Sequence, residues 1–238
     1  PMSKVTIITG GTSGIGRGIA EKILENSASD DILYVSYGHN TEQAEEFLHA
    51  QTEENQKKIR LLQADMSSYD EMMKFVSRVK EEASHVDWLI NNVGISTYAK
   101  YEDYTFDEWT KIVNTNLSVP VFLVKELRLI MSEGGSILFT GSYAGQQAYS
   151  SSLVYGVTKS LVKELEPKQI RVNAIAPGFI ETSWHKNRTP ESYERINRKI
   201  ALHRFGEISE VADMAYEVLK NGYMNGSVVD IHGGYDYF

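Results

Sequence analysis

Hydrophobic residues along the chain fall into short β-branched runs that alternate with longer stretches of helical period. Seven runs predict strands, at residues 5–9, 32–37, 59–64, 88–91, 136–140, 170–176 and 227–231. Between them, apolar positions spaced three and four apart predict helices over 16–26, 43–54, 69–84, 106–131, 155–166 and 210–221. Because strands and helices alternate throughout, we expect a doubly wound α/β fold, with one parallel sheet and helices on both of its faces.

The organisation of the chain favours a single domain over residues 1–238. The 238 residues are 42% hydrophobic, which is enough to build a core, and no linker, repeat or low-complexity tract divides them. One longer irregular insertion, at about 178–200, lies between the last two predicted strands. A lid over a binding site would fit there.

Composition excludes several classes of protein. The chain has no cysteine, and 24 basic against 32 acidic residues give a net charge of −8. We therefore expect no disulfide or zinc–thiolate site, and an acidic protein is a poor candidate for nucleic-acid binding. No apolar run approaches the ~18–20 residues of a membrane span, and the start of the chain resembles no secretory signal. These features predict a cytoplasmic protein. The six histidines form no His-x-x-x-His pair and no clustered carboxylate ligand set, so we expect no metal requirement.

A glycine-rich turn follows the first predicted strand. Residues 10–16 read Gly-Gly-Thr-Ser-Gly-Ile-Gly and lead into a helix. Glycine lets backbone N–H groups close on a pyrophosphate at a helix N-terminus, so this position in an α/β chain indicates a dinucleotide site. A tight strand-to-helix turn without a ligand is the alternative. No Gly-Lys-Ser/Thr follows, which disfavours a nucleoside-triphosphate loop.

Further motifs follow this loop in order along the chain. They are Asn91-Asn92-Val93-Gly94, Asn116 within a predicted helix, Ser142 after the fifth strand, Tyr155-x-x-x-Lys159 and Pro177-Gly178. With the loop, they resemble the short-chain dehydrogenase/reductase family, in the single-domain branch that includes 3-oxoacyl-carrier-protein reductases. The resemblance implies a Rossmann-type fold and hydride transfer between a nicotinamide cofactor and a ketone or secondary alcohol.

Four residues form the predicted catalytic set: Asn116, Ser142, Tyr155 and Lys159. Tyr155 and Lys159 share a helix face, and a lysine cation within ~4–6 Å would lower the pKa of the tyrosine from about 10. Tyr155 is then the general acid or base, and the Ser142 hydroxyl stabilises the carbonyl oxygen. The resemblance further implies that Lys159 holds the nicotinamide ribose and that Asn116 holds a water in a proton relay.

The resemblance also implies a set of cofactor contacts. They are Gly10, Thr12, Ser13, Gly14, Ile15, Gly16, Asp65, Met66, Asn92, Val93, Gly94, Tyr155, Lys159, Pro177, Gly178, Ile180 and Thr182, with Asp65 at the adenine. The second strand ends in Ser36-Tyr37-Gly38-His39-Asn40, without an acid to bind a ribose 2′-hydroxyl. This favours NADP(H), with Ser36, Tyr37, His39 and Asn40 at the adenosine ribose and its 2′-phosphate. Because no arginine stands there, NAD(H) stays open.

The substrate is a small carbonyl or alcohol compound of undefined identity. Aromatic residues near the expected cleft could line a pocket or simply pack: Tyr98, Tyr101, Tyr104, Trp109, Tyr143, Tyr149 and Trp184. Basic residues outnumber acidic ones over 185–199, which fits an acidic carrier, a phosphorylated substrate or, preferably, a solvated amphipathic lid helix. A 3-oxoacyl thioester reductase is the nearest alternative function. A non-catalytic nucleotide-binding regulator and a nucleotide-sugar epimerase or dehydratase are more distant ones.

A homo-oligomer, a tetramer or a dimer, is the expected assembly. Members of the family pair through the helix that carries the catalytic tyrosine. Here Arg171 follows Lys159 by only twelve residues, so about two helical turns of the family's usual length are missing. We expect a weakened interface along that helix, and a second interface anchored by exposed Tyr235, Tyr237 and Phe238.

Overall fold

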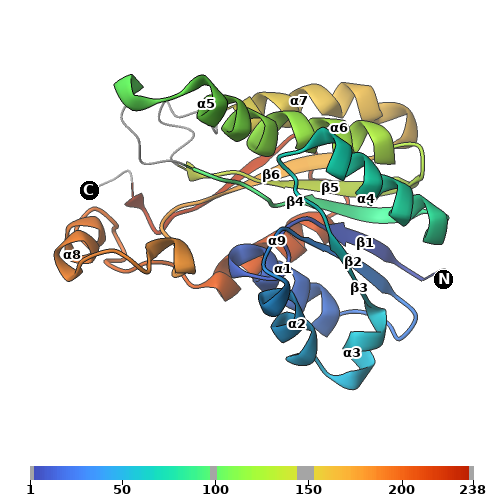
Figure 1. The fold of residues 1–238 in the computed structure, drawn as a ribbon, viewed down its shortest axis with the longest axis horizontal. Helices are drawn as coiled ribbons and strands as arrows, with labels where there is room; N and C mark the ends of the chain where they lie inside the picture. The colour runs from blue at the N-terminus through green and yellow to red at the C-terminus, as the bar shows by residue number, and fades with distance from the viewer. Residues whose placement is uncertain (1–2, 97–100, 144–152, 236–238) are drawn as a thin grey trace.

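A single parallel sheet organises the protein. The computed structural model describes residues 3–96, 101–143 and 153–235. Its seven strands lie in the order β3-β2-β1-β4-β5-β6-β7, all pairs parallel (Figure 1). The strands are β1 (Val5–Ile8), β2 (Ile32–Tyr37), β3 (Ile59–Gln63), β4 (Val86–Asn91), β5 (Met131–Thr140), β6 (Arg171–Pro177) and β7 (Val228–Ile231). The predicted doubly wound Rossmann-type fold is confirmed.

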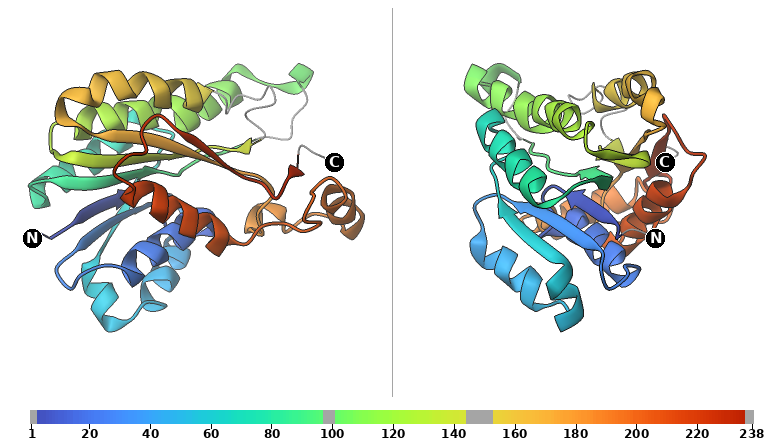
Figure 2. Two further views of the ribbon diagram at one scale, coloured as in Figure 1. Left: turned by 180° about the vertical axis from the view of Figure 1, so that it is seen from behind. Right: turned by 90° about the vertical axis from the view of Figure 1, so that its right-hand side faces the viewer.

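Helices cover both faces of the sheet (Figures 1 and 2). One face carries α1 (Gly14–Glu25), α2 (Thr41–His49), α3 (Glu53–Lys58) and α9 (Ile208–Lys220). The other face carries α4 (Tyr69–Glu82), α5 (Phe106–Val113), α6 (Val119–Leu127) and α7 (Leu153–Leu165). Strand side chains alternate between the two faces, so two separate cores form. Ile8 packs in the core of α1 and α9, and Ile7 packs in the core of α4 and α6.

The sheet contains a switch point between β1 and β4. From β1 the chain first winds outward through β2 and β3, and then returns to β4 on the other side. The loops after β1 and β4 therefore diverge to opposite faces, and ligands of such sheets bind at the carboxyl ends of these strands.

Two predicted helices differ from the observed ones. The segment 43–54 is divided between α2 and α3, because Thr52 begins a new helix with its hydroxyl accepting the Asn55 N–H (3.2 Å). The segment 106–131 is divided by a π-helical turn, Asn114–Ser118, between α5 and α6. The last residue of that predicted helix, Met131, begins β5.

The insertion at 178–200 lies beyond the carboxyl ends of the strands (Figure 1, lower left), and its role as a lid stays a prediction. It contains the short turn Ser183–His185 and the amphipathic helix α8 (Pro190–Asn197). A third small core fixes it, in which Ile196, Ile200 and Phe205 are buried against Tyr193. Within the described ranges, the chain has no helix with the length and apolarity needed to cross a membrane.

Candidate active site

The glycine-rich loop after β1 is shaped by close packing. Gly10 and Gly14 have positive φ angles of +63° and +53°, which favour glycine. A methyl group at Gly16 would lie 2.2 Å from the Gly10 carbonyl oxygen and 2.4 Å from Asn92 Nδ2. The N-cap residue Ser13 makes no side-chain bond to the first turn of α1. The first-turn N–H groups of α1 therefore receive no side-chain cap from Ser13, and we call this turn with the glycine-rich loop the phosphate cradle, because uncapped N–H groups at a helix start are suited to a pyrophosphate.

The loops after β1 and β4 are joined by hydrogen bonds. Thr9 Oγ1 accepts the backbone N–H groups of Asn92 (3.0 Å) and Val93 (3.2 Å), and Asn92 Nδ2 donates to the Gly10 oxygen (3.2 Å). This arrangement places the Asn-Asn-Val-Gly motif beside the phosphate loop. Thr9 begins the glycine-rich spacing that carries the family resemblance, but the role of its hydroxyl in joining the two loops was not predicted from the sequence.

Of the residues predicted to bind the adenosine ribose and its 2′-phosphate at the end of β2, not all face outward. Ser36 is buried, and its hydroxyl accepts the Gly10 N–H (3.1 Å), so Ser36 supports the loop from within and does not face a 2′-phosphate. His39 is 85% exposed, with Nε2 3.5 Å from Asp65 Oδ2. The Asn40 side chain accepts the Gln43 N–H (3.0 Å) and caps α2. His39 and Asn40, together with half-buried Tyr37, remain as the outward-facing candidates for the adenosine ribose.

Asp65, the predicted adenine contact, lies at the end of β3 beside His39. Its Oδ1 accepts from the Ser67 hydroxyl (2.6 Å) and the Ser67 N–H (2.9 Å). The Ser67 hydroxyl, more than any other group, holds the pKa of this carboxylate below its usual range. Asp65 is therefore an ionised acceptor at neutral pH. Its neighbour Met66 is buried.

Asn116 lies in the π-helical turn between α5 and α6. Its Nδ2 donates to the Ile95 carbonyl and its Oδ1 accepts the Ile95 N–H, both at 2.8 Å. The amide thus fixes the backbone directly after the Asn-Asn-Val-Gly motif, a contact that the sequence did not reveal. Both amide atoms are engaged there, and the proton relay that the resemblance implied for Asn116 stays a prediction.

Tyr155, in the first turn of α7, is hydrogen-bonded to the backbone just after β5. Its hydroxyl accepts the Ser142 N–H (3.0 Å) and donates to the Ser142 carbonyl oxygen (2.5 Å). Burial raises the pKa of Tyr155 to about 12, the Ser142 N–H opposes that rise, and the Asp230 carboxylate adds to it. The predicted lowering of this pKa by Lys159 is therefore wrong for this structure, in which Lys159 is exposed.

The turn after β6 brings the lid to the phosphate loop. The Gly178 N–H donates to the Ile231 oxygen (2.8 Å), and a side chain at Gly178 would collide with His232. Ile180 pairs with Gly206 in a parallel bridge and is buried. Further along, the Thr182 methyl group lies 3.9 Å from the position of a methyl group at Gly14. Pro177, which ends β6, therefore leads into a segment that borders the cradle.

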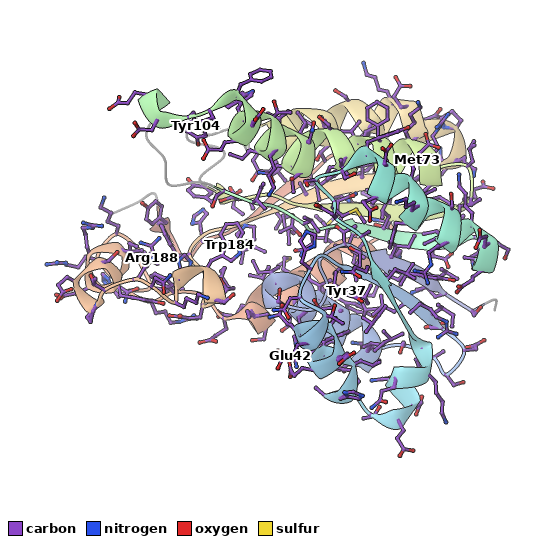
Figure 3. All side chains as sticks on the ribbon, viewed as in Figure 1. Tyr37, Glu42, Met73, Tyr104, Trp184 and Arg188 are labelled. Atoms are coloured by element: carbon purple, nitrogen blue, oxygen red, sulfur yellow. The ribbon has the colours of Figure 1, made fainter. Side chains whose placement is uncertain are left out.

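The aromatic residues near the carboxyl ends of the strands differ in how far their side chains are buried. Figure 3 shows Tyr104, near the start of α5, and Trp184, on the lid, on opposite sides of this edge of the sheet. Trp184 is 59% exposed and Trp109 is 49% exposed, whereas Tyr143 is buried against His232 (ring centroids 4.1 Å apart). Tyr235 packs on Phe179 at 5.3 Å, so it is not the exposed anchor that we expected.

Some predicted residues lie outside the described part of the chain: Tyr98, Tyr149, Tyr237 and Phe238. Among the described residues, no group of three or more histidine and carboxylate side chains is placed to hold a metal ion.

Comparison with known proteins identifies relatives over the whole chain. The family model for short chain dehydrogenase matches residues 4–192. The chain is 31% identical to the 3-oxoacyl-acyl-carrier-protein reductase FabG of Aquifex aeolicus (strain VF5), covering 97% of this chain and 96% of the relative. It is 32% identical to the acetoacetyl-CoA reductase of Rhizobium meliloti (strain 1021), over 100% of both chains.

A solved structure supports the same assignment. The chain resembles the Pseudomonas aeruginosa RhlG/NADP active-site complex with a TM-score of 0.86 and 25% identity, over 98% of this chain and 96% of that one. The family model and the relatives, together with the cradle and the Tyr155–Ser142 contact, lead to one conclusion: the chain belongs to the short chain dehydrogenase family of oxidoreductases.

Proposed function

We propose that the protein is an NADP(H)-preferring oxidoreductase that interconverts a ketone and a secondary alcohol. One observation carries the proposal: the phosphate cradle after β1 and the Tyr155–Ser142 contact after β5 lie at the same edge of one sheet. A dinucleotide that extends from the cradle along this edge reaches the Tyr155 hydroxyl with its nicotinamide. The cradle holds the pyrophosphate, and Asp65 accepts from the adenine.

The chemistry divides between cofactor and protein. The nicotinamide supplies or accepts the hydride, which no side chain can do. In carbonyl reduction Tyr155 donates its Oη proton to the carbonyl oxygen, while the Ser142 hydroxyl donates a hydrogen bond to the same oxygen. A substrate must therefore replace the Ser142 carbonyl as the acceptor of the Tyr155 proton. Lys159, one helical turn away, becomes the counter-charge of the phenolate that forms.

The cofactor preference rests on the end of β2. No carboxylate stands at Tyr37, Gly38, His39 or Asn40 to bind a 2′-hydroxyl or to repel a 2′-phosphate. The ring N–H of exposed His39 and the side-chain amide nitrogen of Asn40 can each donate a hydrogen bond to a phosphate oxygen. The RhlG relative was solved with NADP, which agrees with this preference.

We predict that NADPH binds more tightly than NADH, and that Tyr37→Asp reverses this order. Tyr37 is the last residue of β2, where a carboxylate accepts from a 2′-hydroxyl and repels a 2′-phosphate. Dissociation constants from quenching of protein fluorescence provide the measurement. Tyr37→Asn is the matched control, because it has nearly the same size without the charge, and it should not favour NADH. Tighter binding of NADH by the unaltered protein would overturn the cofactor assignment.

A 3-oxoacyl thioester is the substrate class that we favour second. The relatives named above act, by their names, on 3-oxoacyl and acetoacetyl thioesters. A panel of simple ketones and acetoacetyl-CoA, incubated with NADPH and followed by loss of reduced-nicotinamide absorbance, distinguishes the two classes. Turnover of at least one compound supports the proposal. Tight NADPH binding without turnover of any compound favours a nucleotide-binding regulator instead.

We further propose a homo-oligomer whose contact along α7 is short. The helix ends at Leu165, and three exposed aromatic residues lie on the neighbouring α5 and α6: Phe106 (81%), Trp109 (49%) and Phe122 (40%). Large exposed aromatic side chains are candidates for an association surface. We expect a tetramer that dissociates to dimers on dilution. Sedimentation equilibrium at micromolar protein tests this, and a species near the chain mass of 26.8 kDa would contradict it.

A further inference from the structure

The short segment after β5 is held at both of its ends. The Gly141 N–H donates to a carbonyl oxygen of β6 (2.8 Å), which ties the start of the segment to the neighbouring strand. Two residues later, the Tyr143 side chain is buried against the ring of His232, with ring centroids 4.1 Å apart and planes tilted by 47°. Ser142, whose N–H and carbonyl oxygen both bind the Tyr155 hydroxyl, lies between these two anchors. The position of that hydroxyl therefore depends on both anchors.

His232 is a fixed support for the Tyr143 ring. It follows β7, and its Nδ1 accepts the backbone N–H groups of Gly234 (3.1 Å) and Tyr235 (3.2 Å), so its proton is on Nε2 and the ring is neutral. The turn after β6 packs on it as well, because a methyl group at Gly178 would lie 2.8 Å from His232 Cβ. The imidazole therefore cannot turn without losing two hydrogen bonds.

Further rings hold Tyr143 from another side. The Tyr235 ring lies 6.5 Å from that of Tyr143 and 5.3 Å from that of Phe179, measured between centroids, and Phe179 lies 5.4 Å from Phe205. Aromatic pairs at these separations attract one another in tilted and edge-to-face arrangements. The Tyr143 ring is thus fixed by neighbours from two parts of the chain, and the main chain beside it is fixed with it.

We propose that Tyr143 and His232 are positioning residues, whose paired rings set the Ser142 main chain and, through it, the Tyr155 hydroxyl for proton donation. This inference rests on the proposed role of Tyr155 as the acid. Both rings act through the Ser142 main chain and take no part in the proton transfer itself.

A small displacement of Ser142 is enough to affect the reaction. The Tyr155 hydroxyl is held by hydrogen bonds of 3.0 and 2.5 Å, and such bonds are lost beyond about 3.5 Å. The same displacement would move the Ser142 hydroxyl, which is proposed to bind the carbonyl oxygen. Misplacing reacting groups by ~1 Å can lower a rate about 10²-fold. NADPH binding should change little, because the phosphate cradle follows β1, two strands away from β5.

Tyr143→Leu tests the inference, because it removes the ring and keeps a buried apolar side chain. With NADPH and a ketone that is turned over, we expect kcat to fall at least about fivefold, while KM changes less than about threefold. The dissociation constant for NADPH should stay within about twofold. Tyr143→Phe keeps the ring and should restore kcat to within about twofold of the unaltered protein. A smaller loss of kcat in Tyr143→Leu, or an equal loss in Tyr143→Phe, would overturn the inference.

His232→Asn separates the ring from the turn that it supports. The asparagine side-chain oxygen can accept the same backbone N–H groups as Nδ1, so the turn is kept while the ring is lost. We expect kcat to fall as in Tyr143→Leu, and the double variant to fall no further than either single variant, since both changes remove the same contact. Losses that multiply in the double variant would contradict the pairing.

Phe75→Leu is the matched control for lost packing. Phe75 is a buried ring of α4, so this variant should lower the melting temperature, as Tyr143→Leu does, but leave kcat within about twofold. An equal loss of kcat in Phe75→Leu would count against a positioning role. If Tyr155→Phe retained full turnover, the proposed function would fail. If Tyr155→Phe lost turnover while Tyr143→Leu and His232→Asn kept it, this inference alone would fail.

Discussion

Replacing Tyr155 with phenylalanine is expected to lower turnover at least ~10²-fold while NADPH still binds. The phenol supplies the proton, and general acid–base catalysis contributes about 10²–10⁴-fold. The ring supplies only packing, with Val157 and Leu161 in the same core. Steady-state rates with NADPH and a turned-over ketone measure the first effect, and fluorescence titration with NADPH measures the second.

The matched control for this variant is Tyr69→Phe. Tyr69 is the first residue of α4 and is 48% exposed, so loss of its hydroxyl should leave turnover within about twofold. Near-native turnover in Tyr155→Phe would remove Tyr155 from the mechanism. It would also leave Ser142, whose backbone holds the phenol, without its proposed partner in catalysis.

Replacing Gly16 with alanine is expected to damage the phosphate cradle severely. The new methyl group would lie 2.2 Å from the Gly10 carbonyl oxygen, where the neighbour is backbone and cannot rotate away. Overpacking of this kind costs roughly 1–3 kcal/mol. Since each ~1.4 kcal/mol is tenfold in affinity, we expect a dissociation constant for NADPH raised about tenfold or more, together with a lower melting temperature.

Gly156→Ala is the control for the glycine substitution. Gly156 also lies within a helix, α7, and a methyl group there has no neighbour within 4 Å. The added methyl group should stabilise the helix slightly and leave NADPH binding unchanged. If Gly16→Ala binds NADPH and unfolds as the unaltered protein does, the cradle is not built as we describe it.

The fold could be predicted from sequence because its signals are local and repeated. Each strand is a short β-branched run and each helix has a polar and an apolar face, so their alternation alone indicates the doubly wound sheet. The π-helical turn Asn114–Ser118, which separates α5 from α6, could not be predicted from the sequence. A single wider turn hardly alters the spacing of apolar residues along the helix. Asn116 itself was the available signal, because asparagine is a poor former of helix interiors.

The motifs of the site could also be predicted, but their contacts could not. The spacing of Tyr155 and Lys159 indicated that the lysine cation lowers the pKa of the tyrosine. In the structure the pKa of Tyr155 is raised by burial and by Asp230 and lowered by the Ser142 N–H. Ser142 follows β5 and Asp230 lies in β7, and only the assembled sheet brings these strands to α7. Ser36 shows the same limit: its place at the end of β2 was predicted, while the direction of its hydroxyl depends on the loop after β1.

Transfer of deuterium from NADPH that carries deuterium at both positions of the nicotinamide C4 tests the central claim most directly. The experiment uses the unaltered protein and a ketone found to be turned over, and mass spectrometry measures the alcohol product. We predict that the product gains a single deuterium on the former carbonyl carbon, at a rate that falls at least ~10²-fold in Tyr155→Phe. An alcohol without deuterium, or NADPH oxidation without any alcohol, would contradict hydride transfer to a carbonyl as the reaction of this protein.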